Sequence, residues 1–421
     1  MLNSVLYRPL SHSLFVFLFS VEVLLNSVLQ YSKTVFALCF SINVFLFCLL
    51  CLKRKKIPIF FLILICVSAV YYSLFPNPYM RSEILSYCLL CMIFYLSVDS
   101  LNRDMMLLRT VYSIGVVHCS LCILEFFLKK NLFLDLLGFS GKYDSSMGRV
   151  SGLTTHPIPA AFFALVVLLL SLLFYRVRGQ KKYILYGFIA SCAIILTQSR
   201  SAYLFLVIAA LLYMLMQVFF IKKETSKKRV VGFISLIIFG CVLVIYSSLT
   251  KGFLYEFTFG RFLQLGDVAT AGSLLQRVGS MDFILNYLGS SIFRLSTWCG
   301  HGFGGLYYYL ISHDIWFVKP DYYLVDNQYI SFIYDIGIIG IVVLLFLTAR
   351  QVVEYLDIYF KTRNANVEIS IIPLLMFLSI LFVIFFFEFY GFPICILLFP
   401  LITAFTNVYI GKYESKELEF S

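Results

Sequence analysis

Charged residues are scarce in this sequence. Only 13% of its 421 residues are Asp, Glu, Lys or Arg, whereas 61% are hydrophobic and the mean hydropathy is +0.92. Soluble domains carry about 25% charged residues, so the composition excludes a soluble protein and predicts an integral membrane protein. The net charge of +11 comes from short basic clusters between apolar runs, which indicates membrane topology and no nucleic-acid partner.

Metal-binding motifs are absent as well. The long segments between apolar runs contain no cluster of metal ligands and no acidic DxD motif, so we predict neither a metal nor another cofactor. Nearly all of the 12 cysteines lie inside apolar runs, where a thiol is a small hydrophobic side chain. No cleavable signal peptide is evident, because the first apolar run has little positive charge before it and leads directly into another run.

Apolar runs of about 17 to 25 residues recur along the whole chain, and they predict an all-α protein with about twelve transmembrane helices. We expect these helices near residues 11–30, 34–52, 57–75, 83–98, 105–127, 157–175, 183–198, 202–221, 230–249, 327–348, 370–388 and 391–410. The basic clusters KRKK (53–56), RVRGQKK (176–182) and KKETSKKR (222–229) then fall on one side. The positive-inside rule makes that side cytoplasmic and places both termini there.

With this topology, every long loop lies on the external side. Residues 1–249 hold the first nine helices and an external loop at about 128–156, residues 250–326 form a much larger external loop, and residues 327–421 hold the last three helices and a cytoplasmic tail. Long loops are often functional, so we expect the functional site on the external face.

An arginine at an external helix end needs an explanation. Arg200, in the stretch ILTQSRSAYL, lies at the external end of the seventh predicted helix, where cations are disfavoured. Further external arginines are Arg149, Arg261, Arg277 and Arg294. A guanidinium at the membrane boundary requires a carboxylate or an anionic ligand. Ion pairs with residues such as Glu125 would satisfy single arginines, whereas the whole set favours a diphosphate bound at the membrane surface.

The large external loop contains signs of ordered structure. Apolar residues at alternating steps of four and three predict an amphipathic helix lying on or over the helix bundle, namely Leu274, Val278, Met281, Leu285, Leu288, Ile292 and Leu295. Arg277 would lie near its start and Arg294 near its end. The next stretch, CGHGFGG, predicts a flexible turn around His301. His301 and His313 are external and His156 lies at a junction of loop and helix, so each could titrate near neutral pH.

The chain then re-enters the membrane through DNQYISFIYDIGIIG. Asp326 and Asn327 suit helix capping as well as a functional role. Gly337 and Gly340 are expected to permit close helix packing. Asp335, about two turns into the predicted helix, is expected to face protein or water rather than lipid.

Three stretches in this order carry a resemblance to a known family. They are GRVSGLTTHPIPAAFF, LTQSRSAYL, and QRVGSMDFILNYLGSSIFRLSTWCGHGFGG followed by VDNQYISFIYDIGIIG. Together they resemble the Wzy-type polymerases of O-antigen and capsular polysaccharide and their relatives, the O-antigen ligases. The resemblance covers about residues 148–348, or about half of the chain. It implies a helix bundle of the GT-C type with a large helical periplasmic loop.

The resemblance also implies an activity. It is that of a metal-independent glycosyltransferase of the bacterial inner membrane, which acts on the periplasmic face and inverts the anomeric carbon by direct displacement. Glycan would pass from one undecaprenyl diphosphate to a repeat unit carried by another. The partners that the resemblance implies are these lipid-linked glycans, membrane lipid, and a flippase and a chain-length regulator of the same pathway. Arg149, Arg200 and Arg277 occupy the motif positions to which the resemblance assigns diphosphate binding. Further substrate contacts would come from Arg294, His156 and Asn327.

The general base stays open among Asp326, His301 and His313. Ligases of this superfamily carry a histidine directly before the asparagine at the mouth of the helix after the large loop, and this sequence has Asp326 there. That departure favours a polymerase over a ligase. A transporter or flippase is the alternative from another class, but such proteins place charged sites near the middle of the membrane, whereas the charges here cluster externally.

Overall fold

The structure is a computed structural model. It describes residues 106–136, 138, 149–154, 156–220, 268–302, 304–313, 315–317 and 325–385, together with residues 37, 41 and 44. The helices predicted near residues 11–30, 57–75, 83–98, 230–249 and 391–410, and nearly all of 34–52, lie outside the described residues. The same holds for Arg261. Every regular element in the described part of the chain is a helix.

The chain divides into two compact units, which are described separately. One unit comprises residues 1–107, 268–351 and 384–408, and we call it the loop unit because it contains most of the large external loop. The other comprises residues 108–267, 352–383 and 409–421, and we call it the bundle unit.

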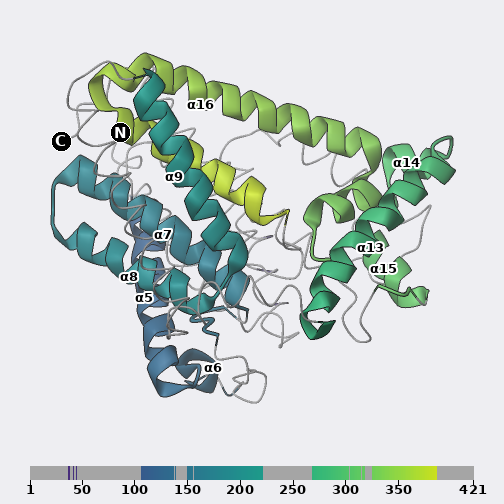
Figure 1. The fold of residues 1–421 in the computed structure, drawn as a ribbon, viewed down its shortest axis with the longest axis horizontal. Coiled ribbons are helices and arrows are strands. Elements are labelled where there is room, and N and C mark those ends of the chain that lie inside the picture. Colours follow the sequence, from purple (N-terminus) through teal and green to yellow (C-terminus); the bar gives the residue numbers. More distant parts are fainter. Residues whose placement is uncertain are drawn as a thin grey trace, which may run out of the picture. The chain divides into compact units, whose positions relative to one another are not determined.

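In the described part of the bundle unit, five helices precede the large loop. They are α5 (Met106–Leu128), α6 (Leu132–Leu136), α7 (Pro157–Arg178), α8 (Lys182–Thr197) and α9 (Arg200–Phe220). The four long helices correspond to the predicted spans near 105–127, 157–175, 183–198 and 202–221. Helix α7 contacts both α8 and α9, and Figure 1 shows α7 and α8 side by side. Most of its side chains are buried, as a helix at the centre of a bundle requires.

The ends of α7 follow directly from its sequence. Pro157 occupies the first turn, where its missing N–H costs nothing, and the His156 side chain accepts a hydrogen bond from the backbone N–H of Ile158. Gly179 ends the helix in the left-handed conformation, and its N–H donates to the carbonyl of Tyr175 at 2.8 Å. The glycine provides the positive φ at which the chain turns toward α8.

Close packing joins α5 to α7. A Cβ atom at Gly115 would lie 2.3 Å from the side chain of Val167, so only glycine allows this approach. Nearer the start of α5, the hydroxyl of Tyr112 lies 2.9 Å from that of Ser171. These contacts join the helix before the first external loop to the helix after it, and thereby bring the two ends of that loop together.

Helix α16 (Gln328–Val383) has 56 residues and includes both spans predicted near 327–348 and 370–388. A straight helix would separate Tyr355 from Phe377 by about 33 Å, at 1.5 Å per residue. Their ring centroids are 5.5 Å apart, so the helix reverses direction between them, as Figure 1 shows.

The ends of the two arms also meet. The backbone N–H of Gln328 donates to the carbonyl of Ile384 at 3.0 Å, and the ring of Tyr329 lies 6.3 Å from that of Phe385. The first and last residues of this hairpin consequently lie at one level, which agrees with the predicted external position of both.

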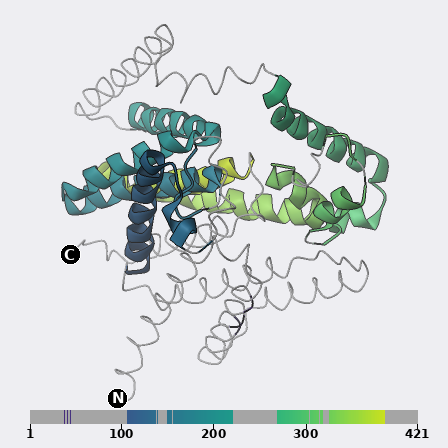
Figure 2. The same ribbon diagram turned by 90° about the horizontal axis from the view of Figure 1, so that it is seen from below.

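The loop unit contains α13 (Val268–Ser291), α14 (Leu295–Cys299), α15 (Gly305–Ser312) and the first arm of α16. These elements gather at one end of that arm in both views (Figure 1, Figure 2). The predicted amphipathic helix is thus confirmed, although it ends at Ser291 and Leu295 begins the next helix. Their shared core is formed by Ile284, Leu306, Leu310, Phe317, Val325, Ile330 and Tyr334.

Three helical segments in the described part of the chain are long and apolar enough to cross a membrane. They are Arg109–Leu128, Pro157–Arg176 and Gln328–Asp357. Shorter apolar helical segments are Lys182–Thr197, Arg200–Tyr213 and Ile371–Val383. The predicted class, an all-helical membrane protein, is confirmed for the described residues, and the number of twelve helices stays a prediction.

Candidate functional site

Arg149 belongs to a loop that the buried carboxylate of Glu125 holds in place. Glu125 lies near the end of α5 and accepts hydrogen bonds from the backbone N–H groups of Ser151 at 3.1 Å and Gly152 at 2.7 Å. The side-chain amide of Asn131 donates to the same carboxylate and to the carbonyl of Gly152. Backbone amides bound to a carboxylate fix the loop more firmly than neutral hydrogen bonds would.

A second side chain of α5 holds the same loop. The Nδ1 atom of the buried His118 accepts a hydrogen bond from the N–H of Leu153 at 3.0 Å, and Nε2 lies 3.1 Å from the carbonyl of Ala160. Gly152, between these anchors, has a φ of +56°, and a Cβ atom there would lie 2.7 Å from the His118 ring. These contacts hold residues 151–153 against α5, two residues after Arg149.

The guanidinium of Arg149 lies at the C-terminal end of α8. Its Nε donates to the carbonyl of Thr197 at 3.0 Å, a position where the helix dipole favours a positive charge. Gln198 follows in the left-handed conformation, with a φ of +53°, and α9 begins at Arg200. This sharp turn brings two of the predicted diphosphate-binding arginines, Arg149 and Arg200, to the same corner of the bundle unit.

His156 belongs to the same corner, where its role differs from the predicted one. Burial, reinforced by the positive charge of Arg149, lowers the pKa of His156 to about 3. Its Nδ1 is occupied in capping α7, because it accepts from the N–H of Ile158. His156 is therefore neutral at physiological pH, and the expectation that it titrates near neutral pH is wrong. Its contact with substrate stays a prediction.

In the loop unit, the glycine-rich turn after α14 wraps around the start of α16. The N–H of His301 donates to the carbonyl of Tyr334, and the N–H of Gly302 donates to that of Asp335. A Cβ atom at Gly300 would lie 2.2 Å from the Asp335 carbonyl oxygen, so side chains are excluded there. The turn is thus tightly packed, and the flexibility predicted from its glycines is wrong.

The carboxylate of Asp335 explains why the turn is fixed. It is 2% exposed and accepts hydrogen bonds from the N–H groups of Gly304 and Leu306, both at 2.9 Å, at the first turn of α15. An aspartate of one helix thereby caps another helix, where both the hydrogen bonds and the helix dipole favour a negative charge. The predicted position of Asp335, facing protein, is confirmed, as is the close approach at Gly337, where a Cβ atom would lie 2.4 Å from the backbone nitrogen of Gly300.

Between Gly300 and Gly302, this turn places His301 in an aromatic environment. Its ring stacks on that of Tyr334, with centroids 4.4 Å apart, and Nε2 lies 2.8 Å from the hydroxyl of Tyr287 on α13. Burial lowers the pKa of His301 below its usual value of 6.5. The imidazole is therefore mostly neutral at pH 7, the form in which it can accept a proton.

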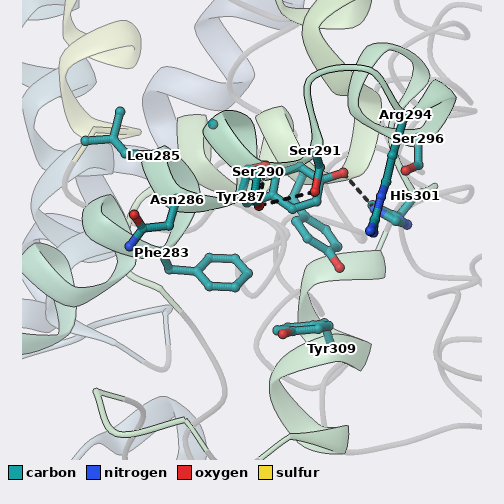
Figure 3. A pocket seen from close by; sticks show the side chains of 12 residues that line it. Phe283, Leu285, Asn286, Tyr287, Ser290, Ser291, Arg294, Ser296, His301 and Tyr309 are labelled. Atoms are coloured by element: carbon teal, nitrogen blue, oxygen red, sulfur yellow. Dashed lines mark hydrogen bonds between the residues drawn. The ribbon is translucent and has the colours of Figure 1, made fainter.

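A pocket of about 710 Å³ opens beside His301 (Figure 3). Arg294 is the permanently charged residue among the described lining residues, and Figure 3 shows it next to His301 and Ser296. The remaining lining residues are mostly aromatic or carry hydroxyl and amide groups, namely Phe283, Leu285, Asn286, Tyr287, Gly289, Ser290, Ser291, Tyr309 and Tyr334. Ring faces and hydrogen-bonding groups around one cation suit a polar ligand that carries negative charge.

Other predicted site residues in the loop unit lie away from the lining of this pocket. Arg277 is half-buried near the start of α13. His313 ends α15, is exposed, and stacks on Tyr309 at 4.1 Å. The side-chain oxygen of Asn327 accepts from the N–H of Tyr329 and thus caps α16, while Asp326 precedes it with a φ of +52°. The capping explanation therefore applies to Asn327, and its part in substrate binding stays a prediction.

Tyr287, Tyr334 and the anchoring role of Glu125 were not foreseen from the sequence. For Glu125 a signal existed, since an ionisable group within an apolar helix is expected to have a specific polar partner. His118 precedes it by seven residues, which places both on one helix face. The two tyrosines carry no comparable signal, because aromatic residues amount to 18% of the chain.

A comparison with curated proteins found no match. A comparison with family models matched residues 185–345 to the family described as O-antigen ligase. The matched region begins in α8 and contains Arg200, the large external loop with its pocket, and most of the first arm of α16. The match supports membership of the O-antigen ligase/polymerase superfamily, which the motifs predicted, and a function related in general to O-antigen or similar polysaccharide.

Proposed function

We propose that the protein is a glycosyltransferase that polymerises undecaprenyl-diphosphate-linked repeat units into O-antigen or capsular polysaccharide on the periplasmic face of the inner membrane. The pocket beside His301 carries this proposal, because it joins a guanidinium, a neutral imidazole and a lining of hydroxyl groups and aromatic rings. Such a lining suits sugars linked to a phosphorylated carrier. The family match over the same region supports it.

In the proposed reaction, a hydroxyl of the acceptor sugar attacks the anomeric carbon of the donor and the lipid diphosphate leaves. Arginines are suited to this step, since guanidinium groups bind phosphate in a bidentate manner and stabilise the charge that develops on the leaving group. We assign this role to Arg149, Arg200 and Arg277. Among the three candidates for the base, His301 is favoured by its lowered pKa and by its place in the pocket.

Synthetic substrates test this proposal directly. Purified protein in liposomes is expected to convert undecaprenyl diphosphate repeat units into a ladder of longer chains in the absence of lipid A core, as read by gel electrophoresis. Each step of the ladder requires a new glycosidic bond. Movement of the lipid-linked sugar across the membrane without any new bond would contradict an enzyme and indicate a transporter.

A ligase is the second candidate, because the matching family model is described as O-antigen ligase. The same assay separates the two activities when lipid A core is added. Transfer of glycan only to the core would identify a ligase, whereas a ladder without core identifies a polymerase. We favour the polymerase because this chain has Asp326 at the position where ligases have a histidine.

The pH dependence of polymerisation tests the role of His301. Because burial lowers the pKa of His301, the neutral imidazole predominates at pH 7, and protonation requires more acidic solution than for an ordinary histidine. We therefore expect kcat/KM to be level in neutral and alkaline solution and to decline in acid, with a midpoint under the usual histidine pKa of about 6.5. The His301→Gln variant is expected to retain a low rate without this acidic decline. An unchanged profile in the variant would assign the decline to another group.

A further inference from the structure

Helix α13 packs against the core of the loop unit through Ile284, Phe283 and Tyr287 and leaves most of the predicted apolar stripe outside. Val278, Met281, Leu285 and Ile292 of the stripe are all exposed, Leu285 by 60%. The buried positions also include Gln276 and Ser280, Gly279 lies against Phe317, and Asp282 and Asn286 are exposed beside the stripe. A helix at a water-covered surface buries its apolar side. The apolar face of α13 therefore requires an apolar environment outside the unit.

The exposed apolar face continues past the end of α13. Phe293 is fully exposed and Leu295 is 75% exposed, on either side of Arg294. The indole N–H of the exposed Trp298 donates to the carbonyl of Ile292, so the ring lies beside the end of the stripe. Tryptophan and arginine next to large apolar side chains are typical of segments at the boundary between a membrane and water.

The contacts of α13 with α16 give its depth relative to the membrane. The first charged residue after Asp335 along α16 is Arg350, and about 20 residues of helix cross the hydrocarbon layer, so that layer begins near residue 330. Tyr334 then lies about 6 Å inside the outer boundary, at 1.5 Å per residue. The rings of Phe283 and Tyr287 on α13 lie 6.0 and 4.9 Å from the ring of Tyr334. The middle of α13 is therefore at the level of the boundary.

We propose that the outer face of α13 and of the 292–298 segment is embedded in the external leaflet of the membrane, with its apolar side chains among the lipid acyl chains. The occupant of this face is bilayer lipid. Leu285 and Arg294 belong both to this face and to the lining of the pocket, so the pocket opens at the level of the lipid head groups. The polar head of a membrane-anchored molecule can then enter this pocket without leaving the leaflet.

The two tryptophans of the chain, Trp298 and Trp316, make the proposal testable by fluorescence. The Trp316→Phe variant retains Trp298 as its single tryptophan and is reconstituted into vesicles of phosphatidylcholine with acyl chains brominated near the head group. Bromine quenches an indole that it touches, so we expect the Trp298 emission to fall by at least about twofold relative to unbrominated vesicles, as for a ring buried at the interface. Aqueous iodide is expected to have little effect. A variant without either tryptophan gives the background.

A second tryptophan position tests whether the quenching extends along α13 or is confined to the surroundings of Trp298. Met281→Trp, made in the background without either tryptophan, puts an indole on the exposed stripe of α13, more than two helical turns before its end. Quenching by brominated lipid at both positions would support the proposal. Strong quenching by iodide with none by brominated lipid would overturn it in favour of water, and resistance to both quenchers would overturn it in favour of cover by protein. This measurement needs no substrate, so its outcome is independent of the proposed polymerase activity.

Discussion

Replacement of Arg200 or Arg277 by alanine is expected to abolish polymer formation while the protein stays in the membrane. Both side chains are half-buried, Arg200 at the first residue of α9 and Arg277 within α13. If they bind the diphosphate, each removal takes away a charge that stabilises the leaving group, and losing one such donor lowers kcat by roughly 10² to 10³. The measurement is the polymer ladder formed by equal amounts of membrane-inserted protein.

A matched control and a conservative variant sharpen this experiment. Arg109 is exposed near the start of α5, at the end predicted to face the cytoplasm, so Arg109→Ala is expected to leave the ladder unchanged. Arg200→Lys keeps the charge but loses the planar fork that binds two phosphate oxygens, so we expect only partial recovery of activity. Chains of full length in both alanine variants would refute the diphosphate role.

The second large effect is expected from Asp335→Asn. The aspartate accepts two backbone N–H groups of the turn and of α15, one on each carboxylate oxygen, and the asparagine has only one oxygen to replace them. One buried N–H is then left facing an NH₂ group, at a cost of about 1 to 3 kcal/mol. The turn that carries His301 is expected to loosen, which lowers both the thermal stability and the polymerisation rate.

The control for this substitution is Asp282, another aspartate of the loop unit that the structure describes. Asp282 on α13 is exposed, so Asp282→Asn changes the same functional group without removing a buried acceptor. We expect its midpoint of thermal unfolding in detergent, and its ladder, to match those of the wild type. Equal midpoints and rates for Asp335→Asn would show that the carboxylate does not hold the turn.

The helices were the part of the fold that local sequence could predict. The spans near 157–175 and 183–198 match α7 and α8 closely, because long apolar runs with basic residues and a glycine between them leave few alternatives for the backbone. The spans near 327–348 and 370–388 were predicted as two helices, whereas the structure has the single helix α16 over both. The reversal within α16 was not resolved from the pattern, because the chain stays helical through it.

The site was predicted less completely than the helices. The external arginines were identified from the cost of a charge at the membrane boundary, and the structure brings Arg149 close to the turn before Arg200. The flexibility predicted for the glycine-rich stretch CGHGFGG was wrong, because glycines by themselves are also consistent with a flexible loop. Its rigidity comes from Asp335, which lies about 30 residues further along the chain and contacts it only in the folded state.

The sequence by itself determined that the described part of the chain belongs to an all-helical membrane protein, where its long apolar helices lie to within a few residues, and which superfamily it resembles. These properties depend on hydropathy, helix-end residues and short motifs, all of which act over a few turns. Only the tertiary structure decided that His301 stacks on Tyr334 beside Tyr287, that Glu125 and Asp335 fix the two loops, and that the apolar stripe of α13 faces outward. Each of these features depends on which distant segments pack together. The periodicity along one helix identifies its apolar face but does not show what packs against that face.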